Sequence, residues 1–222
     1  MRKCLFMKNS KTIVFDLDDT LISELSFLKS AFKEIAEFLE KKNSSSLFKK
    51  MMEWRSRGEN VFENLCKIYK TDVPCLLAIY RNHCALELQV VPETLNVLEN
   101  LRSRGFVLGM ITDGRSRTQR SKIKSAGLEQ FFANENIIIS EEFGSDKTNS
   151  KNFEYFMAKY PNAEYFYIGD NPKKDFFVAN SLGWKTICLL DKGENIHEQN
   201  FDDVPANYLP KLKIYSLKEL AS

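Results

Sequence analysis

The sequence predicts an α/β fold: a doubly wound parallel sheet with an all-helical domain inserted after its first strand. Two observations lead to this prediction. Short apolar runs of strand length alternate along the chain with segments whose apolar residues recur every three or four positions. Between the first two of these runs, residues 23–88 show helical periodicity alone. A chain of 222 residues is long enough for one core domain with a modest insertion.

The first predicted strand, residues 12–15, is β-branched and aromatic and ends in a cluster of carboxylates. The inserted segment follows it with about four helices, because Asn43 to Ser46 and Gly58 interrupt its apolar pattern. These helices are predicted at 23–41, 47–55, 61–69 and 74–86. We therefore divide the chain into an α/β core, residues 11–22 and 89–222, and a helical insert, residues 23–88.

The rest of the chain alternates between helices and buried strands. Helices are predicted at 92–103, 115–126, 151–159, 173–182 and 216–220, and strands at 106–111, 137–139, 165–168 and 186–190. Residues 191–210 are polar and are predicted to form a loop. This alternation is typical of a doubly wound, Rossmann-like sheet.

Acidic, hydroxyl and ammonium groups gather where the predicted strands end. They are Asp16, Asp18, Thr112, Lys147, Asp170 and Asp175. The carboxyl ends of parallel strands share one edge, where α/β proteins bind ligands. Carboxylates there can hold Mg²⁺, attack phosphorus and move protons, while a lysine and a hydroxyl stabilise phosphoryl charge. The pattern predicts phosphoryl transfer, although an aspartate-rich turn after a single strand is also common without any such role.

These residues resemble the four ordered motifs of the haloacid dehalogenase superfamily of hydrolases, over nearly the whole chain. The motifs are Asp16-x-Asp18-x-Thr20, Thr112 after a strand, Lys147, and Gly169-Asp170 with Asp175. The insert is similar to the helical cap of the group that includes phosphoglycolate phosphatases, pyrimidine nucleotidases and acylneuraminate-phosphate phosphatases. We therefore call residues 23–88 the cap.

The resemblance implies a role for each catalytic residue. Asp16 attacks phosphorus and forms an aspartyl-phosphate. Asp18 protonates the leaving alcohol and then deprotonates water. Thr112 hydrogen-bonds the phosphoryl group, and Lys147 neutralises both that group and Asp16. Thr20 braces the loop.

The resemblance also implies a Mg²⁺ cofactor. Its ligands are the Asp16 carboxylate, the backbone carbonyl of Asp18, Asp170 directly, and Asp175 directly or through water. Members that dehalogenate lack an acid at the position of Asp18, so its presence implies a phosphate ester. Two positions depart from the usual pattern. Asp19 stands where glycine is frequent and is predicted to be solvated or turn-forming, and Asp113 stands where asparagine is frequent.

The predicted substrate is a small phosphorylated metabolite, either a sugar phosphate or a nucleotide. Residues 111–131 are similar to members that act on pyrimidine nucleotides or acylneuraminate phosphate. Asp113, Arg81 and His83 are candidates for binding substrate, although helix arginines are usually solvated and His83 could equally be a core histidine. Trp54 has helical spacing and is assigned to the core of the cap.

Two other functions remain possible from the sequence: a phosphomutase of the same fold, and a non-catalytic binding or regulatory protein. A net charge of +2 gives no reason to expect nucleic-acid or anionic-membrane partners. No apolar run reaches membrane-spanning length, and the five cysteines lack metal-type spacing. We therefore expect a cytoplasmic monomer or dimer with free thiols.

Overall fold

The computed structural model describes residues 10–83, 88–202 and 204–221. Its centre is a six-stranded parallel sheet in the order β3-β2-β1-β4-β5-β6. The strands are β1 (Lys11–Phe15), β2 (Val107–Thr112), β3 (Ile137–Ile139), β4 (Glu164–Gly169), β5 (Lys185–Leu189) and β6 (Leu212–Ile214). The predicted doubly wound sheet is confirmed. The sequence prediction missed the edge strand β6, which has only Ile214 buried and therefore lacks an apolar run.

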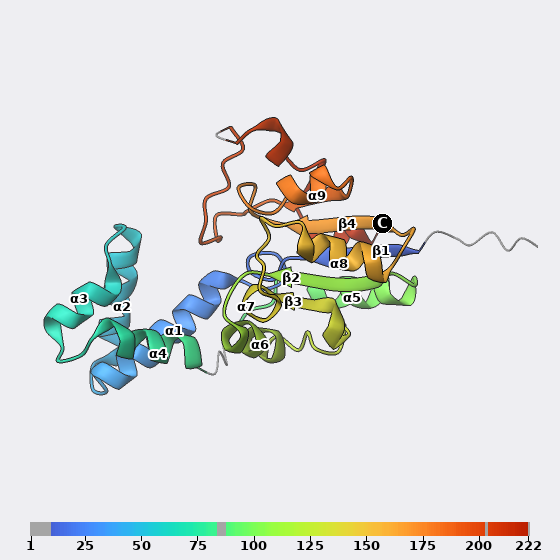
Figure 1. Cartoon of the computed structure of the whole chain (residues 1–222). Helices are drawn as coiled ribbons and strands as arrows, with labels where there is room; N and C mark the ends of the chain where they lie inside the picture. The colour runs from blue at the N-terminus through green and yellow to red at the C-terminus, as the bar shows by residue number, and fades with distance from the viewer. Residues whose placement is uncertain (1–9, 84–87, 203, 222) are drawn as a thin grey trace, which may run out of the picture.

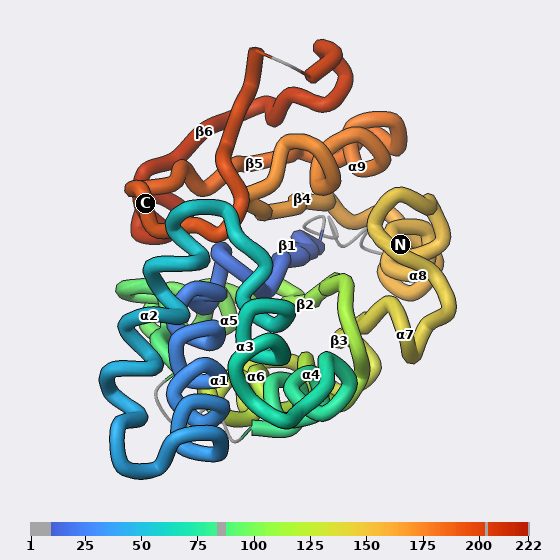
Figure 2. The backbone as a smooth tube through the Cα atoms, turned by 90° about the vertical axis from the view of Figure 1, so that its left-hand side faces the viewer, coloured from blue at the N-terminus to red at the C-terminus, as the bar shows by residue number. Residues whose placement is uncertain are grey.

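Helices cover both faces of this sheet (Figures 1 and 2). The helices α5 (Thr94–Ser103) and α6 (Ser116–Ser125) pack on one face, and α8 (Lys151–Lys159) and α9 (Phe177–Ser181) on the other. Successive residues of a strand point to opposite faces. Thus Ile13 and Phe15 join the core under α5 and α6, while Val14 joins the core under α8 and α9. Burial on both sides explains why β1 ends in three consecutive apolar residues, Ile13, Val14 and Phe15.

Within the described part of the cap, four helices lie beyond the carboxyl ends of the strands, at the left of Figure 1. They are α1 (Glu24–Leu39), α2 (Ser44–Ser56), α3 (Val61–Ile68) and α4 (Val73–Asn82). Each of α1, α3 and α4 begins at a polar side chain that accepts a hydrogen bond from its first turn. Met51, Leu65 and Trp54 are buried in a hydrophobic cluster that these helices share, as predicted for Trp54.

The chain enters and leaves the cap at neighbouring points. The amide of Ser23 donates to the carbonyl of Gln89 at 2.8 Å, and the amide of Val91 donates to the carbonyl of Leu21 at 2.9 Å. The segment that enters the cap and the segment that leaves it are thus hydrogen-bonded to each other. We therefore propose residues 23–88 as the cap, as the sequence suggested. The helix predicted to reach residue 86 ends at Asn82, and residues 84–87 lie outside the described residues.

The segment after β4 differs from the prediction. A helix was predicted from residue 173, whereas α9 begins at Phe177. Before it, the Asp175 side chain accepts hydrogen bonds from the backbone amides of Asp170 and Asn171, which holds this stretch as a turn. A short helix, α7 (Ser140–Phe143), also occupies part of the loop predicted after β3.

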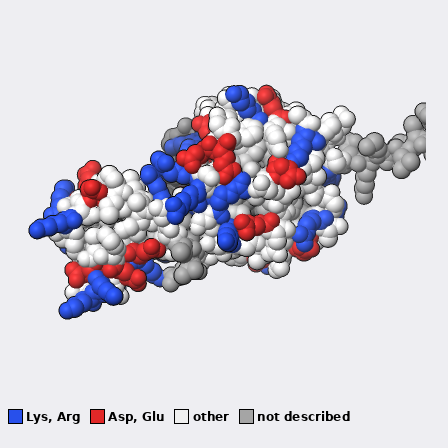
Figure 3. Space-filling view, turned by 60° about the horizontal axis from the view of Figure 1, so that its bottom comes forward, with Lys and Arg blue, Asp and Glu red and all other residues white. Residues whose placement is uncertain are grey.

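On the face shown in Figure 3, basic and acidic side chains are interspersed. None of the helices in the described ranges combines the length and the apolar character needed to span a membrane. Cys66, Cys75 and Cys188 are free thiols, as predicted. The remaining two cysteines, Cys4 and Cys84, lie outside the described residues.

Candidate active site

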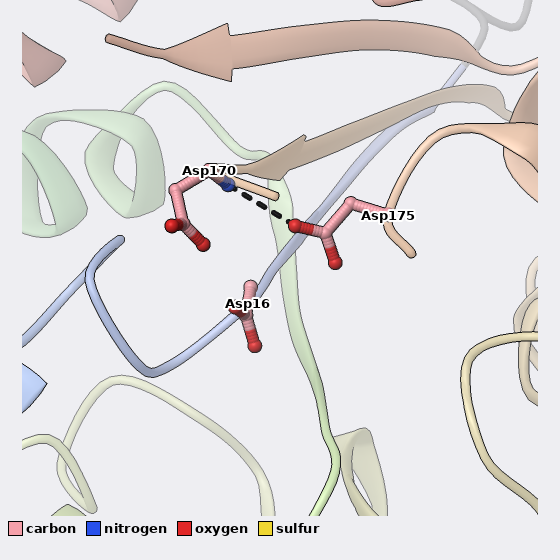
Figure 4. A group of neighbouring side chains, drawn as sticks. All are labelled: Asp16, Asp170 and Asp175. Carbon is pink, nitrogen blue, oxygen red and sulfur yellow. Dashed lines mark hydrogen bonds between the residues drawn. The ribbon is translucent and has the colours of Figure 1, made fainter. Parts of the chain in front are cut away.

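The site is centred on Asp16, the residue that follows β1. Its backbone amide continues the pairing with β4 by donating to the carbonyl of Ile168 at 2.8 Å. This places Asp16 beside the end of β4, where Asp170 follows the strand. Ligand oxygens from Asp16, Asp170 and Asp175 all lie within 4.8 Å of one another, and all three residues are buried (Figure 4). Sheet pairing thus brings together carboxylates that are far apart in sequence.

Lys147 lies among these carboxylates. Its Nζ is 2.5 Å from Oδ1 of Asp16 and 2.8 Å from Oδ1 of Asp175. The loop after β3 is held in place because the Lys147 amide donates to Oδ1 of Asp113 at 3.1 Å. Burial alone lowers the pKa of Lys147, but the charges of Asp16 and Asp175 outweigh it and raise that pKa well above its usual value. The lysine is therefore a fixed positive charge in the site.

If all the buried carboxyl groups were ionised, they would carry more negative charge than Lys147 can balance. Burial raises the pKa of Asp16 to about 8, against the opposing effect of Lys147, and Asp175 and Asp18 raise it further. Burial and the nearby charges of Asp175 and Asp16 raise the pKa of Asp170 to about 9. A hard divalent cation prefers carboxylate oxygens and would stabilise both groups in their charged form. The donor set therefore fits Mg²⁺.

Asp175 differs from the other two carboxylates because protein donors already occupy both of its oxygens. Oδ1 accepts hydrogen bonds from Lys147 and from the Tyr167 hydroxyl at 3.2 Å, while Oδ2 accepts from the amides of Asp170 and Asn171. A side chain at Gly169 would collide with this carboxylate, which explains the glycine before Asp170. The arrangement favours contact between Asp175 and a cation through water.

Asp18 also lines the site and contacts α6. Lys122 Nζ is 2.6 Å from its Oδ1, and Gln119 Nε2 donates to its Oδ2 at 2.9 Å. The same Gln119 nitrogen donates to Oγ1 of Thr112 at 2.6 Å. Gln119 and Lys122 were not predicted as site residues and lie within the stretch 111–131 that resembles other members of the family. Their spacing of three marks one helix face, which could have indicated a shared target.

Asp19 shapes the turn between β1 and the cap. It has a positive φ of 53°, a conformation that glycine and aspartate adopt more readily than most residues. Its carboxylate accepts hydrogen bonds from the amides of Glu24 at 2.8 Å and Ile196 at 3.0 Å. Asp19 is buried, so the predicted solvated side chain is wrong and the turn-forming alternative is supported.

These groups surround a cavity of about 170 Å³. It is lined by Asp16, Asp18, Asp19, Glu24, Thr112, Asp113, Lys147, Asp170, Asn171, Lys174, Asp175 and His197. Among the residues that the structure describes, the lining has seven acidic side chains and two lysines. Every predicted catalytic and carboxylate ligand residue is present, and so is Asp113. A phosphate can enter such an acidic cavity only if added positive charge compensates its own.

Glu24, Lys174 and His197 line the cavity but were not predicted. Burial and the charge of Asp18 raise the pKa of Glu24 to about 7. His197 belongs to the polar loop after β5, where Asn195 Nδ2 donates to Oδ2 of Asp170 at 2.9 Å. Nothing in the loop sequence reveals this contact, because it depends on how the loop folds back over the sheet edge.

The two predicted substrate contacts from the cap do not line the cavity. His83 is buried in the cap against Phe27, with 4.4 Å between ring centroids, and Tyr80 O lies 2.7 Å from its Nδ1. The backbone carbonyl of Arg81 accepts a hydrogen bond from Thr118 of α6 at 3.4 Å. Substrate binding by these two residues stays a prediction.

Comparison with known proteins shows relatives of almost the same length. Glyceraldehyde 3-phosphate phosphatase of Methanocaldococcus jannaschii is 30% identical over 218 residues, covering 91% of this chain and 95% of that protein. The protein of the same name from Methanopyrus kandleri is 27% identical over 213 residues, covering 88% and 91%. The chain therefore matches these phosphatases over most of its length and most of theirs.

Solved structures show the same fold. The HAD-hydrolase YfnB from Bacillus subtilis, in a crystal form bound to magnesium, has a TM-score of 0.67 at 21% identity, covering 96% of this chain and 97% of that one. A HAD phosphatase from Thermococcus onnurineus has a TM-score of 0.60 at 23% identity, covering 95% of both chains. The family model for haloacid dehalogenase-like hydrolases matches residues 13–189. The chain therefore belongs to the haloacid dehalogenase-like hydrolases and is a phosphatase of this family.

Proposed function

We propose that the protein hydrolyses the phosphomonoester of a small sugar phosphate, with glyceraldehyde 3-phosphate as the leading candidate, through an aspartyl-phosphate at Asp16. The observation that carries this proposal is the meeting of Asp16, Lys147 and Asp18 at one acidic cavity. The relatives from Methanocaldococcus jannaschii and Methanopyrus kandleri support the substrate class, because they are glyceraldehyde 3-phosphate phosphatases.

Mg²⁺ is the cofactor that this donor set favours. The carboxylates of Asp16 and Asp170 and the backbone carbonyl of Asp18 would hold it, with Asp175 acting through water. When bound, the cation would neutralise part of the charge of the phosphate. The raised pKa values of Asp16 and Asp170 support this assignment.

In the first step, a carboxylate oxygen of Asp16 attacks phosphorus. Lys147 holds Oδ1, so Oδ2 is the oxygen available for attack. The new bond joins Asp16 to phosphorus, and the bond between phosphorus and the ester oxygen breaks. Asp18 transfers its proton to that departing oxygen, which leaves as the free alcohol.

In the second step, water attacks the phosphorus of the aspartyl-phosphate. Asp18, now a carboxylate, takes a proton from this water, and the bond between phosphorus and Asp16 breaks. Inorganic phosphate leaves, and both aspartates return to their starting state. Thr112 and Lys147 contact the phosphoryl group in both steps and stabilise its charge.

The size of the cavity favours a small substrate. About 170 Å³ is below the volume range of pockets that hold drug-sized ligands, roughly 300–1,000 Å³. A triose phosphate suits this space better than a nucleotide, which carries a base and a ribose as well. Asp113 lines the cavity and is proposed to contact the hydroxyl or carbonyl groups of the sugar.

Hydrolysis is favoured over the phosphomutase alternative because the relatives are phosphatases. A non-catalytic role is disfavoured because Asp16, Asp18, Lys147 and Asp170 are all present. Identification of the product separates these functions: a hydrolase releases inorganic phosphate, whereas a mutase returns an isomeric phosphate ester.

The test is phosphate release with Mg²⁺ across a panel of phosphomonoesters. The panel holds glyceraldehyde 3-phosphate, other sugar phosphates, phosphoglycolate, acylneuraminate phosphate, nucleotides and p-nitrophenyl phosphate. We expect the highest kcat/KM with glyceraldehyde 3-phosphate and no turnover in EDTA. Preference for a nucleotide would contradict the proposed substrate, and full activity in EDTA would contradict the proposed cofactor.

A further inference from the structure

Lys122 is a buried cation that the proposed mechanism does not use. Only 4% of its side chain is exposed, whereas lysine is almost never fully buried without a partner. Its ammonium group lies 2.6 Å from Oδ1 of Asp18, a carboxylate that is 19% exposed. Together with Gln119 on Oδ2, this contact gives each oxygen of Asp18 its own donor from α6.

The position of Lys122 is fixed from the cap as well as from the core. Its Nζ lies 4.4 Å from the centre of the Phe27 ring, which belongs to α1. A cation over an aromatic face is attracted by the ring and keeps that interaction when water is excluded. Phe27 is itself buried and packs against His83 of the cap. The ammonium group therefore lies between Asp18 and a cap side chain.

Gln119 adds a second constraint on the same carboxylate. Its amide nitrogen donates to both Asp18 and Thr112, so it fixes the distance between the proton donor and the phosphoryl-binding hydroxyl. The Gln119 side chain packs closely over Gly114, where an added Cβ would come within 3.0 Å of it. Both α6 side chains are thus held by packing, as a preorganised site requires.

We propose that Lys122 is a positioning residue for leaving-group protonation: it orients Asp18 and stabilises the carboxylate that Asp18 becomes when it gives up its proton. This inference rests on the proposed function and assigns a role to a residue outside the four motifs. As the proton passes from Asp18 to the ester oxygen, negative charge appears on Oδ1 and Oδ2, next to the Lys122 ammonium and the Gln119 amide.

The role has a distinct kinetic consequence. An alkyl ester such as glyceraldehyde 3-phosphate releases an alkoxide unless its departing oxygen is protonated. By contrast, p-nitrophenyl phosphate releases a phenolate that is stable without a proton. The value of kcat/KM reports the steps up to release of this leaving group. Loss of Lys122 should therefore lower kcat/KM for the alkyl ester much more than for the aryl ester.

The experiment compares Lys122→Met with wild type on both substrates. Met keeps the apolar stem against Phe27 and removes the ammonium group. We expect kcat/KM to fall about 100-fold for glyceraldehyde 3-phosphate, or for the alkyl ester that wild type prefers, and less than about fivefold for p-nitrophenyl phosphate. The matched control is Lys124→Met, an exposed lysine of the same helix, which should change either value less than about twofold.

Two additional variants keep the test decisive. Circular dichroism and melting temperature check that Lys122→Met folds, and Lys122→Gln, which keeps a hydrogen-bond donor, replaces it if it does not. Phe27→Leu keeps the lysine and removes the ring beneath it. It should produce the same preference for the aryl ester with a smaller loss.

The outcomes separate this inference from the proposed function. If wild type releases phosphate from neither ester, the proposed function fails and this inference fails with it. If wild type is active but folded Lys122→Met loses equal activity on both esters, or loses none, the function stands and the positioning role is overturned. A loss confined to the alkyl ester supports it.

Discussion

Glu24 is a carboxyl group at the cavity whose pKa, about 7, is raised by burial and by the charge of Asp18. Its usual value is 4.5, so between pH 4.5 and about 7 the folded protein holds this proton more tightly than the unfolded chain does. The stability that Glu24 contributes is therefore fully present below pH 4.5 and is lost as the pH rises through about 7.

This loss of stability with rising pH gives a prediction for Glu24→Gln, which keeps the shape of the neutral acid. In EDTA, the variant should exceed wild type in free energy of unfolding by about 1–2 kcal/mol at pH 8 and match it at pH 5, with allowance for the partly buried position. Urea denaturation at the two pH values measures this difference. An equal difference at both pH values would show that the charge of Glu24 is not its source.

At the level of single residues, the sequence predicted what the chemistry of the strand ends requires. Thr112 ends its strand, and Asp16, Lys147 and Asp170 come after the ends of neighbouring strands, so their meeting could be inferred from the order of elements. The hydrogen bonds that orient these side chains could not be inferred from the order of elements. The link from Asn195 to Asp170 depends on a loop fold that no apolar pattern reports.

At the level of elements, the cap helices share a hydrophobic cluster separate from the two clusters that pack against the sheet. Leu65 of α3 and Leu101 of α5 are both fully buried, one in each kind of cluster. Replacing either by Ala should cost about 2–5 kcal/mol, because the substitution removes apolar contacts and leaves a cavity.

Hydrogen exchange can show which part of the chain each substitution destabilises. Leu65→Ala should lower the protection of amides in α1 to α4 more than that of amides in β1, β2 and β4, and Leu101→Ala should do the reverse. This result would support residues 23–88 as a unit that opens by itself. Equal loss of protection across cap and sheet in Leu65→Ala would contradict the proposed division.

Element predictions failed where polar contacts override apolar periodicity. The turn before α9 forms because the Asp175 carboxylate accepts hydrogen bonds from the backbone amides of Asp170 and Asn171. These contacts compete with a helix that begins earlier. By contrast, α8 was predicted with the same bounds that the structure shows, because Phe153 and Phe156 lie on one buried face.

At the level of the whole molecule, the parallel sheet explains why one small cavity is lined by residues as far apart in the sequence as Asp16 and His197. Strands β1, β2 and β4 are adjacent, so the loops that follow them meet at one edge. The cap lies beyond that edge, as Figures 1 and 2 show, and reaches the site through Glu24 and Phe27. The order of the strands thus brings the catalytic side chains together, and the cap contributes Glu24 to the lining of the cavity.

The most direct test of nucleophilic catalysis by Asp16 is the rate of phosphate release by Asp16→Asn with Mg²⁺ and the best substrate of the panel. The variant keeps the size of the side chain but lacks the attacking carboxylate, so we expect release to fall at least about 10⁴-fold while circular dichroism shows a folded protein. Release within about tenfold of wild type would contradict a phosphorylated Asp16, and with it the proposed mechanism.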